Sequence, residues 1–424
     1  MAVSSAPVAA APTTFDPHAF DPFAPDQLEN PYPLYAQARR DQPVFYSQRL
    51  DMWVVTRHDD ILAVQKQPER FSSGQALEAT STMPAPVQAV LETGFAQFQS
   101  LVQTDPPDHA RVRAVFGKAL TPQRVAALEP RIRELANSLI DDFVADGQAD
   151  LVTHFAFPLP GYVICDLLGV PRADMPLLKR GHDARQVLMS AHGALESMVA
   201  AAEEFIALQR YFIGHLERRV HAPQDDLLSL LVPTEIGGTA PLTMQEAVCN
   251  AIDLFAAGHE TTTDLIGNGI SLLLAHPEQM QALRDDPGLI PDAIEEMLRI
   301  EAPVRGMFRV TTAELELGSA RLPQGAKLFL LYGSANRDET QFAQPDVFNI
   351  RRKDASKHLA FGKGMHFCIG SVLARLEGRI AFELLLQRLP GLRRQLDQPA
   401  VRRPFLILRG YDHFPIAWDR PVVS

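Results

Sequence analysis

"FGKGMHFCIG", residues 361–370, places a cysteine among three glycines and between aromatic side chains. Gly362, Gly364 and Gly370 allow backbone bends that other residues resist, and they let a flat molecule approach the chain closely. Cys368 stands near the end of this loop. The stretch therefore predicts a thiol in an open, flexible turn.

The segment after this loop, residues 371–389, is predicted to be a helix, because apolar residues from Ile369 to Leu384 recur at helical spacing. Cys368 is then expected at a helix N-terminus, where free N–H groups and the helix dipole stabilise a thiolate. Such a thiolate could serve as a nucleophile or as an axial ligand of iron. The alternative is a buried structural thiol, which is the usual role of an isolated cysteine.

The composition describes a chain that is able to bury a large core. It has 424 residues, 46% of them hydrophobic, and a net charge of −11 that is spread along the sequence. A nucleic-acid partner is not expected from such a surface. The cysteines Cys165, Cys249 and Cys368 show no paired spacing, so a reducing compartment fits better than a disulfide framework or a zinc site. These features favour a cytoplasmic location.

The N-terminus is expected to be a disordered tail. Residues 1–20 lack the basic residues of a signal peptide and are rich in alanine and proline. No apolar stretch reaches the roughly 18 residues of a membrane span, so no membrane partner is expected. Because no change in composition divides the remainder, residues 21–424 are predicted to form one domain.

The rest of the chain is mainly α. Helical periodicity is strongest in residues 125–147, 194–220, 243–276 and 290–300. Strand-like segments are short, as in residues 313–318 and 326–333, and residues 72–104 are predicted to be a long loop with some helix.

"FAAGHETT", residues 255–262, interrupts the apolar pattern of the long helix. Gly258 weakens a helix by about 1 kcal/mol relative to alanine. The Thr261 hydroxyl is expected to bond the carbonyl of Ala257, four residues back. Small residues thus form a groove beside an acid, Glu260, and a hydroxyl. The alternative is a polar kink that faces solvent.

Two further pairs have helical spacing. Glu296 and Arg299 in "EEMLR" are three residues apart and could form an ordinary ion pair. His109 and Arg113 in "DHARVR" are four apart, which suits an anion, although a solvated face is the common alternative.

Taken together and in this order, the four motifs resemble those of the cytochrome P450 family. "FGKGMHFCIG" resembles its cysteine-ligand loop, "AGHETT" its oxygen-activation motif and "EEMLR" its Glu-x-x-Arg motif, while "QPDVFNIRR" is similar to the segment between them. The resemblance runs from about residue 21 to the C-terminus, in the short, soluble bacterial style. It implies a P450 fold of many helices with small β-sheets, in which haem lies between the long central helix and the cysteine-loop helix.

The resemblance assigns the cofactor residues. Cys368 would be the thiolate ligand of the iron of haem b. The haem propionates would be held by the basic side chains of His109, Arg113, Arg309 and His366. The haem ring would be contacted by Ala257, Phe361, Gly362 and Gly370. Glu296, Arg299 and Arg352 would be structural.

The resemblance also implies a monooxygenase mechanism, with dioxygen as co-substrate. Glu260 and Thr261 match the acid–alcohol pair that delivers protons to oxygen, and hydroxylation or oxidative dealkylation would follow. The chain has no flavin or iron–sulfur signature, so electrons from NAD(P)H are expected through a ferredoxin and its reductase. A peroxide-driven haem enzyme and a non-catalytic haem sensor are the alternatives, and a monomer is expected.

By family topology the substrate would be small and largely apolar or aromatic. The expected contacts are Phe95, Phe98, Leu101, Val102, Ala257, Val304, Met307, Ile407 and Leu408. Asp253 shares a helical face with Ala257 and Glu260, and predicts a neutral hydroxyl-bearing or cationic substrate. Arg305 is a rival that could pair with Asp253 or receive an acid, and Asp253 could also point to a neighbouring helix. Arg111, Lys118 and Lys363 are expected to form a positive face for the redox partner.

Overall fold

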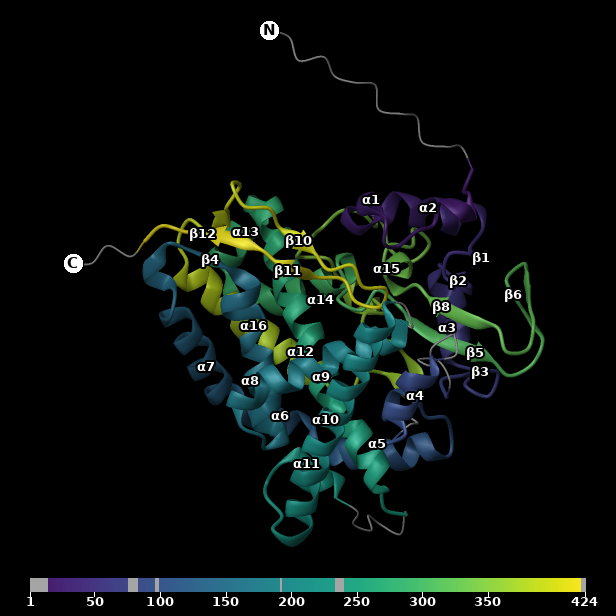
Figure 1. Cartoon of the computed structure of the whole chain (residues 1–424). Coiled ribbons are helices and arrows are strands. Elements are labelled where there is room, and N and C mark those ends of the chain that lie inside the picture. The colour runs from purple at the N-terminus through teal and green to yellow at the C-terminus, as the bar shows by residue number, and fades with distance from the viewer. Residues whose placement is uncertain (1–13, 75–82, 96–98, 191–192, 233–239, 421–424) are drawn as a thin grey trace.

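The computed structural model describes residues 14–74, 83–95, 99–190, 193–232 and 240–420, and confirms a mainly helical chain with small sheets (Figure 1). The helices are α1 Pro25–Glu29, α2 Tyr32–Asp41, α3 His58–Gln65, α4 Ala85–Leu91, α5 Asp108–Ala119, α6 Pro122–Ala127, α7 Glu129–Asp141, α8 Pro158–Leu168, α9 Met175–Ser190, α10 Leu195–His221, α11 Leu227–Leu231, α12 Met244–Ala275, α13 Pro277–Asp285, α14 Ile290–Ile300, α15 Tyr332–Ala335 and α16 Ser371–Arg388. The strands are β1 Val44–Ser47, β2 Met52–Val55, β3 Phe71–Ser72, β4 Gln148–Asp150, β5 Met307–Thr311, β6 Leu315–Leu317, β7 Ala320–Leu322, β8 Lys327–Leu330, β9 Arg393–Arg394, β10 Val401–Arg402, β11 Tyr411–His413 and β12 Pro415–Ala417.

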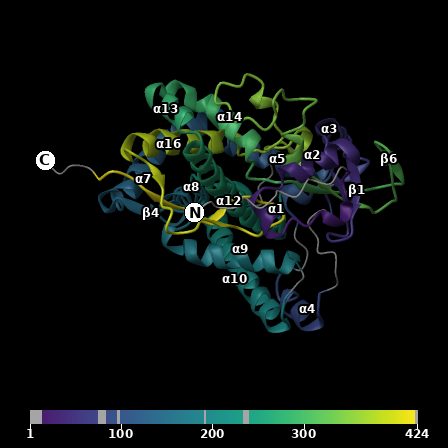
Figure 2. The same cartoon turned by 90° about the horizontal axis from the view of Figure 1, so that it is seen from above.

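Helix α12 runs through the middle of the helical part of the molecule in both views (Figure 1, Figure 2). It begins at a capping box, in which Thr243 and Glu246 satisfy each other's backbone N–H groups. Such a cap fixes the start of a helix that must then cross the core.

The two halves of α12 belong to different apolar clusters. The first half, from Ala247 to Phe255, packs with α5, α8, α9, α10 and α11. The second half, from Leu265 to Leu273, packs with α7, α14 and α16. Burial of these two halves stabilises the helix on both sides of the segment from Ala256 to Asp264, which contains Glu260 and Thr261.

A five-stranded sheet in the order β1–β2–β8–β5–β3 forms the β-rich part, which lies at the same side in both views (Figure 1, Figure 2). β2 and β8 pair in parallel, whereas β5 runs antiparallel to β8. Arg309 lies opposite Leu328 in this pairing and is 6% exposed. The sheet therefore holds a buried arginine.

The predicted end of the N-terminal tail is wrong for residues 14–20. Pro17–Ala19 forms a 3-10 helix capped by Asp16, and Phe15 and Phe20 are buried against Phe45. Aromatic burial of this kind outweighs the entropy lost when a short segment is ordered. Residues 1–13 lie outside the described part of the chain.

Within the described ranges, no helix combines the length and the apolar character that a bilayer span requires.

Candidate haem-thiolate site

The polar segment of α12 has the local geometry that the sequence predicts. Thr261 Oγ1 donates to the carbonyl oxygen of Ala257 at 2.8 Å. Ala257 is exposed although the helix is buried on both sides of it. A Cβ on Gly258 would lie 3.0 Å from Ile164 of α8, so the glycine allows the two helices to pack closely. Small residues therefore open one side of α12 and admit α8 on another.

Glu260 is held from α9 by two side chains. Its Oε2 lies 3.1 Å from Nε2 of His182, and the Gln186 amide nitrogen donates to both carboxylate oxygens at 3.2 and 3.1 Å. His182 and Glu260 are only 9% and 12% exposed. The acid is thus a fixed, largely buried group.

The charge of Glu260 follows from these contacts. Burial opposes its ionisation, but the charge and hydrogen bond of His182, together with Arg403, lower the pKa of Glu260 to about 2. Glu260 is therefore a carboxylate at neutral pH and accepts a proton only while it is transferring one.

The cysteine loop is built on two left-handed glycines. Gly362 and Gly364 have φ values of 64° and 70°, a conformation that side chains resist. Gly370 has an ordinary φ of −84° and caps α16, so the prediction that it permits a bend is wrong. The backbone N–H of Cys368 donates to the Phe361 oxygen at 2.9 Å, which closes the loop.

The thiol lies just before the helix, not in its first turn. Burial raises the pKa of Cys368, and the Gly370 N–H, Arg113 and Arg375 offset only part of that effect. The Gly370 N–H at the helix end stabilises the thiolate as expected, but in the protein alone desolvation outweighs this effect. A metal ion deprotonates a thiol that binds to it outright.

Four basic side chains meet beside this loop. Arg113 donates to the Phe367 oxygen at 2.8 Å, and His366 Nε2 lies 3.0 Å from Ser73 Oγ. The rings of His109 and His366 are 4.4 Å apart. Burial, Arg309, His109 and Arg113 together lower the pKa of His366 to about 3. All four predicted propionate ligands are thus brought together.

This basic cluster (His109, Arg113, Arg309 and His366) fits an anion. Arg309 is buried, and burial lowers its pKa. Its Nη1 donates to the oxygen of the neighbouring Phe308, and among the described residues it has no ion pair. His109 Nε2 is buried without a hydrogen-bond partner there. Two carboxylates would satisfy these donors, which is what the propionates of haem supply.

The predicted structural trio is also formed. Arg299 donates to Glu296 from Nε at 2.7 Å and from Nη2 at 2.8 Å, and both residues are 0% exposed. Arg352 Nε reaches the same carboxylate at 3.1 Å. A fully buried bidentate pair with a third partner joins α14 to the segment before the cysteine loop.

The predicted substrate contacts come from several elements. Val304 and Leu408 form an isolated bridge, and Ile407 accepts from the Arg305 N–H at 2.6 Å. The Leu101 N–H donates to Asn250 of α12 at 2.9 Å, which brings the predicted loop against that helix. Phe95, Leu101, Val102, Val304, Met307 and Ile407 are partly exposed, Leu408 is buried, and Phe98 lies outside the described residues.

Asp253 has a partner that the sequence did not reveal. Arg185 of α9 donates to its Oδ1 at 2.6 Å, while Oδ2 is buried without a hydrogen-bond partner among the described residues. The rival Arg305 is wrong as this partner, because its Nη1 donates to the Pro22 oxygen at 3.2 Å. Asp253 is thus half of an ion pair between two helices.

The predicted positive face is smaller than expected. Arg111 forms a hydrogen-bonded ion pair with Glu246. This contact, together with Asp108, raises the pKa of Arg111. Its charge is therefore compensated, whereas Lys118 is exposed and Lys363 half-buried.

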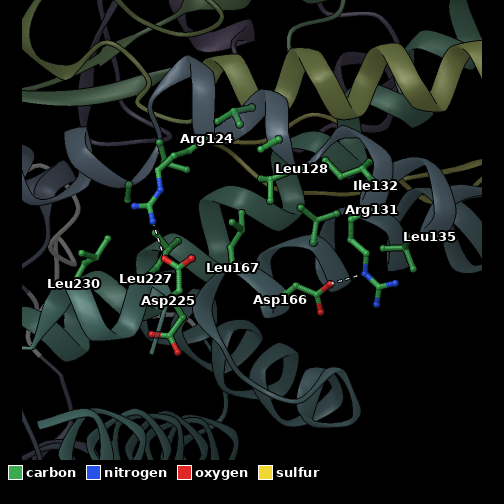
Figure 3. Close-up of a pocket in the computed structure, with 16 residues that line it drawn as sticks. Arg124, Leu128, Arg131, Ile132, Leu135, Asp166, Leu167, Asp225, Leu227 and Leu230 are labelled. Carbon is green, nitrogen blue, oxygen red and sulfur yellow. Dashed lines mark hydrogen bonds and ion pairs between the residues drawn. The ribbon is translucent and has the colours of Figure 1, made fainter. Parts of the chain in front are cut away.

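A separate pocket of about 280 Å³ opens among α6, α7, α8 and α11 (Figure 3). Its walls are leucines such as Leu128 and Leu167, and its rim holds the ion pairs Arg124–Asp225 at 2.7 Å and Arg131–Asp166 at 3.7 Å. None of the predicted site residues lines it.

Sequence reasoning missed the groups that surround the predicted ones. His182, Arg185 and Gln186 lie at helical spacing in α9, and this polar face was the one available signal. Asp264, one turn beyond Glu260, was part of the same polar segment of α12.

A partly exposed cysteine loop, a cluster of bases that fits an anion and an acid–hydroxyl pair on the central helix are the features of a haem-thiolate protein. The cytochrome P450 family model matches residues 176–287 and 288–400. The cytochrome P450 monooxygenase PikC of Streptomyces venezuelae is 37% identical over 406 residues, which cover 93% of this chain and 92% of that protein. The 6-deoxyerythronolide B hydroxylase of Saccharopolyspora erythraea is 35% identical, with coverages of 92% and 96%.

Solved structures agree with these matches. The complex of cytochrome P450 CREJ with (4-ethylphenyl) dihydrogen phosphate has a TM-score of 0.89 and 31% identity, and the alignment covers 95% of this chain and 100% of that one. The chain therefore belongs to the cytochrome P450 family. It is a haem-thiolate monooxygenase that uses haem b and molecular oxygen, as predicted.

Proposed function

We propose that the enzyme inserts one oxygen atom of O2 into a largely apolar or aromatic organic substrate, by hydroxylation or oxidative dealkylation. Electrons come from NAD(P)H through a ferredoxin and its reductase. The observation that supports oxygen-driven turnover is the pair Glu260 and Thr261, with Glu260 held at 3.1 Å from His182.

The bound haem supplies dioxygen activation, which consumes two electrons and two protons. Cys368 would bind the iron, and the basic cluster would hold the propionates. Thr261 presents a hydroxyl on the open side of α12, where it stabilises the oxygen that receives the protons. Glu260 accepts a proton from the outer side and passes it toward Thr261. In this proposal Thr261 provides orientation and Glu260 provides the proton supply.

The alternatives make different demands on these residues. A peroxide-driven enzyme has no need of a proton relay, because peroxide brings both oxygen atoms in reduced form. A haem sensor without turnover has no use for the acid–alcohol pair at all. The presence of both Glu260 and Thr261 favours the ferredoxin-fed monooxygenase.

We further propose that Asp253 accepts a hydrogen bond from a neutral hydroxyl of the substrate. Arg185 neutralises the charge of Asp253, which removes the reason to expect a cationic amine. Oδ2 is still free of a protein partner within the described ranges, and a buried acceptor of this kind requires a donor.

The redox partner is proposed to dock near Lys118 and Lys363 and to carry a complementary acidic surface. We propose a cytoplasmic location, where NAD(P)H and reduced ferredoxin are present, and a monomeric enzyme.

The proposal is tested with the purified holoenzyme, a ferredoxin and its reductase. A panel of small aromatics, terpenoids and fatty acids is first screened for a shift of the haem spin state. The best compound should then drive NADH consumption and incorporate one atom of 18O2. Turnover with peroxide alone, or binding without NADH consumption, would contradict the proposal.

A further inference from the structure

A second carboxyl group lies one turn beyond Glu260 on α12. The side chain of Asp264 is 0% exposed. Both of its oxygens are buried without a hydrogen-bond partner among the described residues. Residues four apart on a helix have Cβ atoms about 5–6 Å apart, so Asp264 and Glu260 are neighbours on one face. The monooxygenase mechanism described above does not use Asp264.

The C-terminal hairpin, residues 401–413 with strands β10 and β11, covers this carboxyl. A Cβ on Gly410 would lie 1.8 Å from Asp264 Oδ1, so the hairpin backbone lies directly against the group. The hairpin thus separates Asp264 from solvent, while a glycine leaves room for the carboxyl itself.

An arginine joins Asp264 to the surface of the hairpin. Arg403 Nη2 lies 3.6 Å from Asp264 Oδ1, and its Nε donates to Asp412 Oδ1 at 2.9 Å. Asp412 is 43% exposed. A line of charged side chains therefore leads from solvent through Asp412 and Arg403 to Asp264. Glu260 lies one turn away from Asp264 on α12.

Glu260 and Asp264 differ in how readily they hold a proton near neutral pH. Burial raises the pKa of Asp264 to about 7; Arg403 and Arg402 offset part of this, while Glu260 and Asp412 add to it. The pKa of Glu260, by contrast, is lowered to about 2. A protonated acid beside an ionised one is the arrangement of a proton donor and its acceptor.

We propose that Asp264 is a proton-supplying residue that feeds Glu260 from the side of the C-terminal hairpin. This inference rests on the proposed role of Glu260 as the relay to Thr261. In the step, the O–H bond of Asp264 breaks and an O–H bond forms on Glu260 by way of a water molecule, because Asp264 has no direct hydrogen-bond partner among the described residues. A water molecule that enters beside Asp412 then returns a proton from solvent to Asp264. Arg403 keeps its protons and holds the carboxyl in place.

The step is uphill while His182 holds Glu260 as a carboxylate. It becomes less so when the hydrogen bond from His182 is broken, because that contact favours the ionised form of Glu260. Asp264 thus acts as a proton reserve that Glu260 draws on during turnover.

Turnover of the best panel compound gives the first test, with Asp264→Asn, Arg403→Gln and Glu260→Gln beside wild type. Wild-type kcat should fall as the pH rises through about 7. Asp264→Asn should lose about tenfold in kcat, less than the roughly hundredfold of an acid that acts directly. It should also lose this pH dependence, show a larger solvent isotope effect and keep its spin-state affinity. Arg403→Gln should move the pH dependence upward.

Infrared spectroscopy without turnover gives the second test. Labelling with 13C-aspartate separates a protonated Asp264 from Glu377, a buried acid on α16 whose pKa burial also raises. The labelled band should vanish as the pH rises through about 7 in wild type, at lower pH in Glu260→Gln, which loses a charge that raises the pKa of Asp264, and at higher pH in Arg403→Gln. This measurement still applies if Asp264→Asn does not fold.

The outcomes separate the two proposals. If Glu260→Gln keeps full kcat, the proposed relay fails. If Glu260→Gln is slow while Asp264→Asn keeps wild-type kcat and pH profile, only the Asp264 inference is overturned. The absence of a titrating aspartic acid band in wild type would overturn it as well.

Discussion

His182 Nε2 of α9 lies 3.1 Å from Glu260 Oε2 of α12, and the Gln186 amide nitrogen lies 2.9 Å from that same imidazole nitrogen. One ring nitrogen cannot donate to Glu260 and accept from Gln186 at once. A proton on Nε2 therefore bonds the carboxylate, and its loss lets Nε2 accept from Gln186 instead. Either state leaves α9 attached to the acid, because Gln186 also donates to Glu260.

The first prediction concerns acid stability. Glu260 has a folded pKa of about 2 and an ordinary pKa of 4.5, so its stabilising effect is complete above 4.5 and is lost as the pH falls toward 2. The free energy of unfolding of wild type, minus that of Glu260→Gln, should be constant near neutrality. Below pH 4.5 it should shrink by up to about 1.4 kcal/mol per pH unit.

Urea unfolding between about pH 3.5 and 7 measures this difference, across the range in which a glutamate normally titrates. His182→Gln is the matched variant. Because it removes the main cation beside Glu260, it should raise the pKa of the acid and weaken the acid-dependent loss. A difference that stays constant down to the lowest pH would contradict the contact.

The second prediction concerns the iron ligand. Cys368→Ala should abolish the absorption band that gives the family its name when the reduced protein is treated with CO. Cys165→Ala and Cys249→Ala are the controls. Both thiols are buried, and burial raises the pKa of each to about 12, so neither is available as a thiolate. A band that survives in Cys368→Ala would refute the assignment.

Local sequence patterns were sufficient to predict individual helices and the contacts within them. Helical periodicity predicts α12 and α16, and the Thr261 hydroxyl bonds Ala257 as expected because both groups lie on one helix. The loop glycines Gly362 and Gly364 have left-handed φ values, which agrees with the prediction that they allow bends that other residues resist.

Contacts between helices could not be predicted from these local patterns. Arg185 is 68 residues from Asp253, and Arg111 is 135 residues from Glu246. Which residues pair depends on how two helices are rotated against each other, and periodicity within one helix does not determine this. The pKa of Cys368 was missed for a related reason, because desolvation depends on what the fold packs around the thiol.

The third prediction concerns the proton relay. Thr261→Ala should keep substrate binding but divert electrons to hydrogen peroxide, because the hydroxyl that assists protonation is gone. Thr262→Ala is a neighbouring control, since Thr262 is 2% exposed and points into the core. Peroxide formed per NADH consumed is the readout. Equal coupling in Thr261→Ala and wild type would place the relay elsewhere.

The fourth prediction concerns the redox partner. Lys118→Glu and Lys363→Glu should slow electron transfer from an acidic ferredoxin, and the wild-type rate should fall as salt rises. Surface attraction of this kind is screened over about 8–10 Å at ordinary ionic strength. Lys179→Glu is the control, because Lys179 lies on α9, a helix that packs on α8, α10 and α12 and carries neither lysine of the proposed docking face. Stopped-flow reduction measures the rate, and insensitivity to both salt and charge reversal would count against this docking face.

The last prediction concerns the polar group of the substrate. Three compounds on one ring, a carboxylate, an alcohol and an amine, are titrated by spin state. Wild type should bind the alcohol most tightly, because one oxygen of Asp253 has no hydrogen-bond partner among the described residues while Arg185 cancels its charge. Asp253→Asn should weaken the alcohol by about tenfold, the usual effect of losing a hydrogen bond to a charged group. Arg185→Gln should shift the preference toward the amine, since it leaves a negative charge without its cation. Tightest binding of the carboxylate to wild type, or an Asp253→Asn series identical to wild type, would show that Asp253 serves only to join α9 and α12.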